Sequence, residues 1–169
     1  MHHVDYMAIA DKAMEQIRKG AFLTVQAGDQ LNVMTIGWAS LGFLWARPML
    51  TVMVRKSRHT FGIIEKSTEF TVTVPLADMS KELEICGTKS GKDHDKFKEC
   101  SLELFPGQKV HTPVINTPGI NFECKIIYKS KLDPDNLIDS YKHLYPNRDY
   151  HTLYYGEIVY CYSTADARG

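Results

Sequence analysis

Two kinds of hydrophobic periodicity alternate along the chain and divide it into helical and extended segments. Apolar side chains recur every three or four positions over residues 5–19, which predicts an amphipathic helix with Asp5 as its N-cap and Gly20 at its end. β-branched residues and alternating apolar residues then predict a series of strands. These strands span residues 21–27, 31–38, 49–55, 69–75, 120–128 and 153–162.

Shorter helical patterns fill the intervals between the predicted strands. They cover residues 58–66, 78–86, 93–98 and 137–144. Strands and long helices do not alternate regularly, which disfavours a doubly wound parallel sheet. The pattern favours a mainly β fold with peripheral helices, in which about six antiparallel strands form a small barrel. No repeat, low-complexity tract or linker divides the chain, so residues 1–169 are expected to form a single domain.

Composition and charge narrow the classes of function. The 169 residues are enough to bury a core without disulfides or metals. Lys and Arg number 20, as do Asp and Glu, so the formal net charge is zero. A neutral chain is a poor candidate for a nucleic-acid coat or a polybasic membrane binder. No run approaches the ~20 apolar residues of a membrane-spanning helix. We therefore expect neither a nucleic-acid partner nor a membrane.

Cysteine usage and the first residues bear on location. The chain starts without a basic segment followed by an apolar run, so no signal peptide is expected. The four cysteines have no CxxC spacing, which predicts free thiols in a reducing cytoplasm. The histidines form no HExxH motif and no zinc spacing, so no metal site is predicted. Cys86 fits a buried apolar thiol better than a redox group.

One stretch of the chain has an unusual charge distribution. Acidic residues are absent from positions 30–64, although four basic residues lie there. One interpretation is a solvated basic face beside buried strands. The other is an anion site in the segment Arg-Lys-Ser-Arg-His-Thr at 55–60, where a strand gives way to a helix. Guanidinium groups, hydroxyls and the free N–H groups of a helix start all bind phosphate. The pattern leaves both interpretations open.

A second segment, Gly-Thr-Lys-Ser-Gly-Lys at 87–92, resembles a P-loop but fails its pattern. The P-loop has four residues between its glycines, and Ser or Thr after its Lys. Here three residues separate the glycines, Asp93 follows Lys92, and a predicted helix precedes. The segment is therefore either a plain turn between helices or a second strip of phosphate or ribose donors.

Single residues in two strands are also candidates for a site. Asn32 is disfavoured in a strand, and Gly37 indicates either a bulge or the close approach of a ligand, with a plain bulge the simpler interpretation. His151 opens the last predicted strand, two residues after Asp149, and is a candidate for a site at a strand end. No GxSxG nucleophile elbow and no GxGxxG dinucleotide motif occurs.

Several of these segments carry a resemblance to a known family. Asn-Val-Met-Thr-Ile-Gly-Trp at 32–38 resembles an N-x-M-T-x-x-W strand, and Val-Arg-Lys-Ser-Arg-His-Thr at 54–60 resembles a V-R-x-S-R-x-T phosphate segment. Ser-Gly-Lys-Asp-His-Asp-Lys-Phe at 90–97 is similar to S-G-R/K-D-x-D-K-F. Asp-Tyr-His at 149–151, with Gly-Glu-Ile at 156–158, looks like a D-x-H…G-E-V ending. In this order the patterns resemble those of the flavin reductase-like family, the FMN-binding split barrels that include flavoredoxin and the flavin reductases.

The resemblance implies an FMN-binding split β-barrel, with FMN bound near the interface of a homodimer. The residues that it implies around the FMN phosphate are Arg55, Ser57, Arg58 and Thr60, with Ser90, Gly91 and Lys96 nearby. The residues that it implies along the isoalloxazine ring are Asn32, Met34, Thr35 and Trp38. His151 would lie near the reactive face of the flavin as the catalytic residue.

The resemblance also implies an activity. Hydride from NADH or NADPH would pass to bound FMN, and electrons would go on to free flavin, iron, a quinone or a redox protein. The protein would bind, orient and tune the flavin. The alternative is a flavoredoxin-like electron carrier without nicotinamide-dependent activity of its own, which shares every binding motif. A third alternative, an oligonucleotide-binding small barrel, is disfavoured by the neutral charge.

Overall fold

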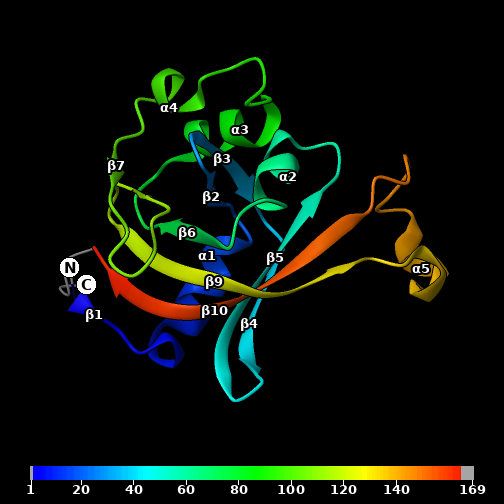
Figure 1. Cartoon of the computed structure of the whole chain (residues 1–169), viewed down its shortest axis with the longest axis horizontal. Coiled ribbons are helices and arrows are strands. Elements are labelled where there is room, and N and C mark those ends of the chain that lie inside the picture. The colour runs from blue at the N-terminus through cyan, green and yellow to red at the C-terminus, as the bar shows by residue number, and fades with distance from the viewer. Residues whose placement is uncertain (1, 165–169) are drawn as a thin grey trace.

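The computed structural model of the chain describes residues 2–164 and is built around one antiparallel sheet (Figure 1). The expected single domain 1–169 includes residues 1 and 165–169, which lie outside the described residues. The strands of this sheet are β1 (His2–His3), β2 (Ala21–Ala27), β3 (Gln30–Ile36), β4 (Ala39–Leu44), β5 (Arg47–Arg55), β6 (Glu69–Pro75), β9 (Gly119–Lys131) and β10 (His151–Ser163). They lie in the order β3-β2-β6-β9-β10-β5-β4, and β1 pairs with β10. The strands β7 (Leu104–Phe105) and β8 (Val114–Ile115) form a separate two-stranded sheet.

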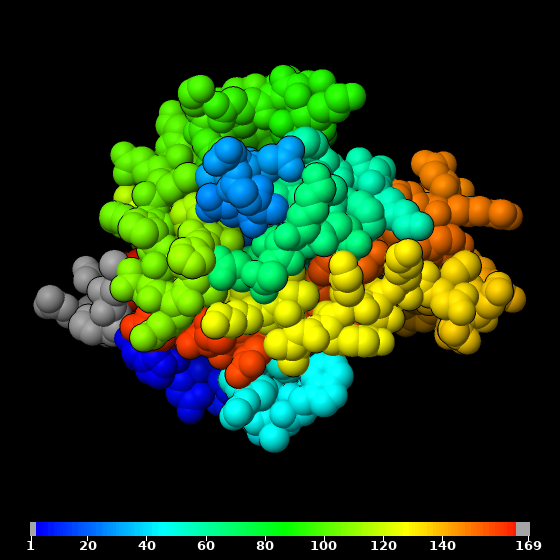
Figure 2. Space-filling model, viewed as in Figure 1, coloured from blue at the N-terminus to red at the C-terminus, as the bar shows by residue number. Residues whose placement is uncertain are grey.

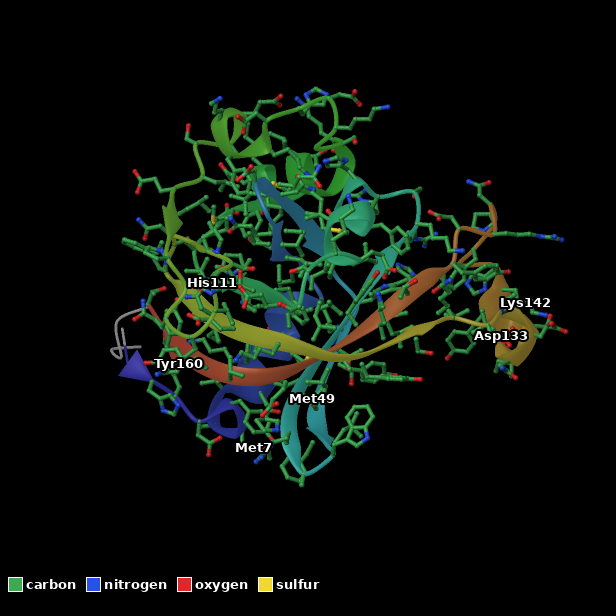
Figure 3. The ribbon with its side chains drawn as sticks, in the orientation of Figure 1. Met7, Met49, His111, Asp133, Lys142 and Tyr160 are labelled. Carbon is green, nitrogen blue, oxygen red and sulfur yellow. The ribbon has the colours of Figure 1, made fainter. Side chains whose placement is uncertain are left out.

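Short helices surround the sheet. The α-helices are α1 (Ala10–Ile17), α2 (His59–Ile64), α3 (Ser80–Thr88), α4 (Lys96–Glu99) and α5 (Asp139–Lys142), and 3-10 turns form at Tyr6–Ile9 and Pro134–Asn136. Helices α3 and α4 cover the end of the molecule near β3, while α5 lies at the opposite end of β9 and β10 from β1 (Figure 1). The segment around α5 projects from the body in the space-filling view (Figure 2). Asp133 and Lys142 lie in this projection (Figure 3). Between residues 2 and 164, none of the helices has the length and apolar character that a bilayer crossing requires.

The expected fold class is confirmed, and several element bounds differ from expectation. The strand predicted at 31–38 ends at Ile36, because Gly37 and Trp38 form the passage to β4, which the pattern did not predict. Strand β1 was also not predicted, so with β4 the main sheet has eight strands rather than about six. The separate sheet of β7 and β8 was not predicted either. The helices predicted at 93–98 and 137–144 are reduced to the single turns α4 and α5.

The two edges of the main sheet are consecutive along the chain. Strands β3 and β4 end the strand order on opposite sides, yet only Gly37 and Trp38 separate them in sequence. Their ends must therefore lie close together, which requires the sheet to curl until its edges meet. No β-ladder bridges these two strands within residues 2–164. The result is an open barrel with a seam at Gly37 and Trp38.

The core fills the inside of the curled sheet. Phe70, Phe122 and Tyr154 are fully buried there, from three neighbouring strands. A β-carbon on Gly156 would lie 2.5 Å from the Phe70 ring, so the close packing at this point requires glycine. The ladder between β9 and β10 shifts register between Tyr155 and Gly156, where the long strand β10 bends. This bend helps the sheet to curl.

Candidate functional site

Two hollows share Arg58 as part of their walls, and the first of them lies at the seam of the barrel. The first, the seam hollow, has a volume of about 240 Å³. It is lined by Met34, Thr35, Ile36, Gly37, Trp38, Met53, Arg55, Arg58 and His151. The second, the cationic hollow, has a volume of about 190 Å³. It is lined by Asn32, Ser57, Arg58, His59, Thr60, Thr88, Lys89, Ser90, Gly91 and Lys96.

The structure therefore gathers the twelve residues that the sequence singled out. Met34, Thr35, Trp38 and His151 line the seam hollow, as do Arg55 and Arg58. Asn32, Ser57, Thr60, Ser90, Gly91 and Lys96 line the cationic hollow, again with Arg58. They come from β3 and the junction after it, from the end of β5, the turn after it and the start of α2, from the turn after α3, and from α4 and β10. These segments are far apart in sequence. Their roles toward a ligand stay predictions.

Lys96 gives the cationic hollow its charge. The residue is only 2% exposed, and the carbonyl oxygen of Cys86 accepts a hydrogen bond from its Nζ at 3.4 Å. Within residues 2–164 Lys96 forms no ion pair with a carboxylate. Burial, together with the nearby Arg58 charge, lowers the pKa of this ammonium to about 8. A buried cation without a counter-charge is costly, so this position favours an anion.

Arg58 lines both hollows, and carbonyl groups at the end of α3 fix the orientation of its guanidinium. Its Nη1 donates to the carbonyl oxygen of Gly87 at 2.6 Å, and its Nη2 donates to that of Cys86 at 3.2 Å. Burial and the neighbouring Arg55 charge lower the pKa of Arg58. Its guanidinium is thus held in place by carbonyl groups rather than by a carboxylate, and its positive charge adds to that of Lys96.

The hydroxyl groups of the cationic hollow have different partners. Thr60 Oγ1 accepts a hydrogen bond of 2.8 Å from Nδ2 of the buried Asn32. Ser57 donates from both its backbone nitrogen and its hydroxyl to the carboxylate of Asp149. Ser57 is therefore already bonded to an anion, unlike Lys96. Gly91 packs against Asn32 so closely that a β-carbon there would overlap the Asn32 side-chain oxygen.

Two residues line a different hollow from the residues with which the resemblance groups them, and their roles toward FMN stay predictions. The resemblance puts Arg55 with the phosphate ligands, but its guanidinium lines the seam hollow. It donates to the carbonyl oxygens of Leu144 at 3.2 Å and Asp149 at 3.4 Å, because β5 and β10 pair Arg55 with His151. The resemblance puts Asn32 along the ring, but its bond to Thr60 holds it in the cationic hollow.

His151 lies in an aromatic setting at the seam hollow. Its Nδ1 is 2.8 Å from the hydroxyl oxygen of Tyr145, and its ring centroid is 5.3 Å from that of Trp38. The Arg55 guanidinium lies 4.9 Å from the centre of the Tyr145 ring, a cation–π contact. Burial and the Arg55 charge lower the pKa of His151 to about 4, so the imidazole is neutral at pH 7.

Among the residues near the seam hollow that sequence reasoning did not single out are Met53 and Tyr145. Met53 lines this hollow from β5, and Tyr145 holds His151 from the segment after α5. The alternation of 49–55 places Met53 on the same strand face as Arg55, so it could have been inferred. Nothing in the pattern around Tyr145 indicated its contact. Among residues 2–164, no group of three or more His, Cys, Asp or Glu side chains could hold a metal ion.

Comparison with known proteins gives an independent result. The family described as flavin reductase like domain matches residues 17–169. An uncharacterized protein of Pyrococcus abyssi is 32% identical over 135 residues, covering 78% of this chain and 66% of the relative. The chain thus spans about two thirds of the length of that relative.

Two solved structures share the fold. Flavoredoxin from Methanosarcina acetivorans superimposes with a TM-score of 0.65 at 28% identity, covering 85% of this chain and 67% of that one. The NADH:FAD oxidoreductase of Streptomyces globisporus C-1027 superimposes with a TM-score of 0.64 at 16% identity, covering 96% of this chain and 87% of that one. At this lower identity the second likeness concerns the fold alone.

Proposed function

The chain belongs to the flavin reductase-like family, and from this premise we propose that it is an FMN-binding oxidoreductase. The phosphate of FMN would lie in the cationic hollow and its ring in the seam hollow. NADH or NADPH would donate the hydride, and free flavin, iron, a quinone or a redox partner would accept the electrons.

The observation that carries the proposal is that Lys96 is buried and has no carboxylate partner among residues 2–164. A phosphate group would supply the missing negative charge, and Arg58 beside it would add a charge-assisted hydrogen bond. A β-carbon on residue 91 would overlap the Asn32 side chain, so glycine at this position allows Asn32 to keep its place in the wall of the cationic hollow.

The seam hollow suits a flat aromatic ring. Trp38 and Met53 supply polarisable apolar surface, and Met34 and Thr35 add strand backbone beside them. When bound, FMN supplies a ring that accepts two electrons as a hydride and passes them on. The chain's own part is to hold the phosphate with Lys96 and Arg58, exclude water with Trp38, and present the neutral His151 to the ring hollow.

A second copy of the chain is the proposed partner. Trp45, Tyr128 and Tyr155 form an aromatic cluster with ring centroids 5.5 to 5.9 Å apart, and Trp45 is 59% exposed. Phe43 is also exposed on the same hairpin of β4 and β5. Exposed aromatic patches of this kind are typical of interfaces. In analytical ultracentrifugation the wild type is expected to sediment as a dimer and the Trp45→Ser variant as a monomer. A monomeric wild type would contradict the proposal that a second copy of the chain is the partner.

An electron carrier is the second candidate. The likeness to a flavoredoxin at 28% identity over 85% of this chain favours it. Both candidates need the same flavin site, so they differ only in whether a nicotinamide reduces the flavin.

The test is an anaerobic absorption titration of protein loaded with FMN and freed of excess flavin. Bleaching of bound flavin on adding NADH or NADPH supports the oxidoreductase and identifies its donor. Flavin that stays oxidised until a reduced partner protein is added supports the carrier. A protein that retains no flavin contradicts both.

A further inference from the structure

The two ring nitrogens of His151 have different surroundings. Nδ1 lies 2.8 Å from the Tyr145 hydroxyl oxygen, inside the structure. Nε2 has no hydrogen-bond partner among residues 2–164, and it is not among the atoms sealed from solvent. Since His151 lines the seam hollow, Nε2 is the ring nitrogen available to a ligand there.

The direction of the Tyr145 bond follows from counting protons. Tyr145 is 5% exposed, and burial raises the pKa of its hydroxyl, so the proton stays on the oxygen. That buried O–H needs an acceptor, and within the described residues its only partner is Nδ1 of His151. Tyr145 therefore donates and Nδ1 accepts. A neutral imidazole carries one proton, which must then be on Nε2.

The surroundings hold this arrangement in place. The Tyr145 ring lies beside the Arg55 guanidinium at 4.9 Å and packs on the Tyr150 ring with centroids 4.9 Å apart. Trp38 lies against both the Tyr145 and the His151 rings. The charged groups around His151 are Arg55 and Asp149. Burial first, and then the Arg55 charge, oppose a positive charge on the imidazole and keep it neutral.

We propose that Tyr145 is a positioning residue that holds His151 as its Nε2–H form, so that the seam hollow offers one neutral hydrogen-bond donor to a carbonyl oxygen. The ligand class is a carbonyl compound that stacks beside the flavin, such as the carboxamide of a nicotinamide or a quinone acceptor. This ligand class rests on the proposed function. The proton position on His151 does not.

The first test is nitrogen NMR of the His151 ring in the protein without flavin at pH 7. We expect Nε2 to show the signature of a protonated nitrogen and Nδ1 that of an unprotonated one. Tyr145→Phe removes the donor while keeping the ring, and His151 should then become a mixture of both forms. Tyr150→Phe, which removes a hydroxyl from the adjacent ring, should leave the spectrum unchanged. A wild-type proton on Nδ1 overturns the proposal, whatever the flavin titration shows.

The second test uses side chains that imitate one ring nitrogen each. In His151→Gln the amide nitrogen lies near the place of Nε2, and in His151→Asn near that of Nδ1. With flavin bound, Gln should keep the reaction rate within about threefold, and Asn should lower it about tenfold, as expected for one lost hydrogen bond. Measuring reduction by nicotinamide and reoxidation by quinone separately shows which carbonyl uses the donor. Equal rates for the two variants in both half-reactions overturn the carbonyl assignment.

Discussion

Gly91 and Asn32 lie in such close contact that a methyl group on residue 91 would overlap the Asn32 carboxamide. The carboxamide in turn donates a hydrogen bond to Thr60. The packing of three segments of the cationic hollow therefore requires that residue 91 has no side chain. Gly91→Ala should push Asn32 away from Thr60 and weaken FMN binding about tenfold, as expected for one disturbed hydrogen bond. Fluorescence titration with FMN measures this.

Gly42→Ala is the matched comparison for Gly91→Ala. Gly42 lies in β4, and a β-carbon there meets nothing within 4 Å. Its FMN affinity should equal that of the wild type. If both variants bind FMN equally well, the contact with Asn32 has no part in binding.

Lys96 should contribute to the affinity for FMN but not to the stability of the fold. Replacing it by Met removes a buried ammonium that has no carboxylate partner in the described part of the chain, so the free energy of unfolding should not fall. FMN affinity should fall about 10-fold to 100-fold, as expected for one charged hydrogen bond. Lys98→Met, on the exposed face of the same helix, should change neither. Urea unfolding measures the stability of both variants, and FMN titration measures their affinity. Equal FMN affinities of the two variants would show that Lys96 does not bind FMN.

The titration of Lys96 predicts a pH dependence of opposite sign for folding and for binding. Its pKa falls from 10.5 to about 8 on folding, so the unfolded chain binds more protons between these values. The Lys96 contribution to stability therefore rises with pH from about 8 to 10.5. FMN binding needs the charged form, so affinity should fall as pH rises through about 8. The difference between wild type and Lys96→Met, measured from pH 7 to 9.5, isolates both effects; parallel curves contradict the assignment.

Arg58 and Arg55 should contribute unequally to FMN binding. Arg58 faces both hollows and is held by two carbonyl groups, whereas Arg55 faces the seam hollow and the Tyr145 ring. Arg58→Ala should weaken FMN binding about tenfold or more, since it removes a charged hydrogen bond. Arg55→Ala should have the smaller effect on FMN affinity and the larger effect on the His151 pKa, which should rise. Affinity measurements and histidine NMR titrations compare them, and the reverse order of FMN affinities would falsify the division of the two hollows.

Gly156 should be needed for the close packing of β10 against the core. A β-carbon there would lie 2.5 Å from the Phe70 ring and 2.7 Å from Cβ of Cys124. Gly156→Ala should lower the free energy of unfolding by roughly 1–3 kcal/mol, the cost of overpacking a core. Urea unfolding of this variant and of Gly42→Ala compares their free energies of unfolding. Equal values would show that the core relaxes enough to accommodate the added methyl group.

Strong local patterns made part of the fold predictable. The bounds of Ala21–Ala27 and Glu69–Pro75 were predicted to the residue, because a glycine or a proline ends a β-branched run at these places. Strand Ala39–Leu44 was missed because it is an edge strand, with apolar side chains that stay partly exposed. Its extended form depends on pairing with Arg47–Arg55, which a local pattern does not contain.

The candidate site was predictable as a set of segments but not as a geometry. Lys96 is a residue type that is usually exposed, so its burial against the end of α3 could not be read from its neighbours. Tyr145 meets His151 only because the chain folds back between β9 and β10. The motif order predicted which residues gather, and the pairing of β5 with β10 decided that Arg55 faces His151.

The junction at Gly37 and Trp38 also limits how the barrel can move. Three Cα steps from Ile36 to Ala39 reach at most about 11 Å, so the edge strands cannot separate at this point. Any fluctuation that opens the barrel must pivot about this short tether, with the widest displacement at the far ends of β3 and β4. The short connection is thus a fixed pivot for the two edge strands. Trp38 forms part of it and stays close to both strands when their far ends separate.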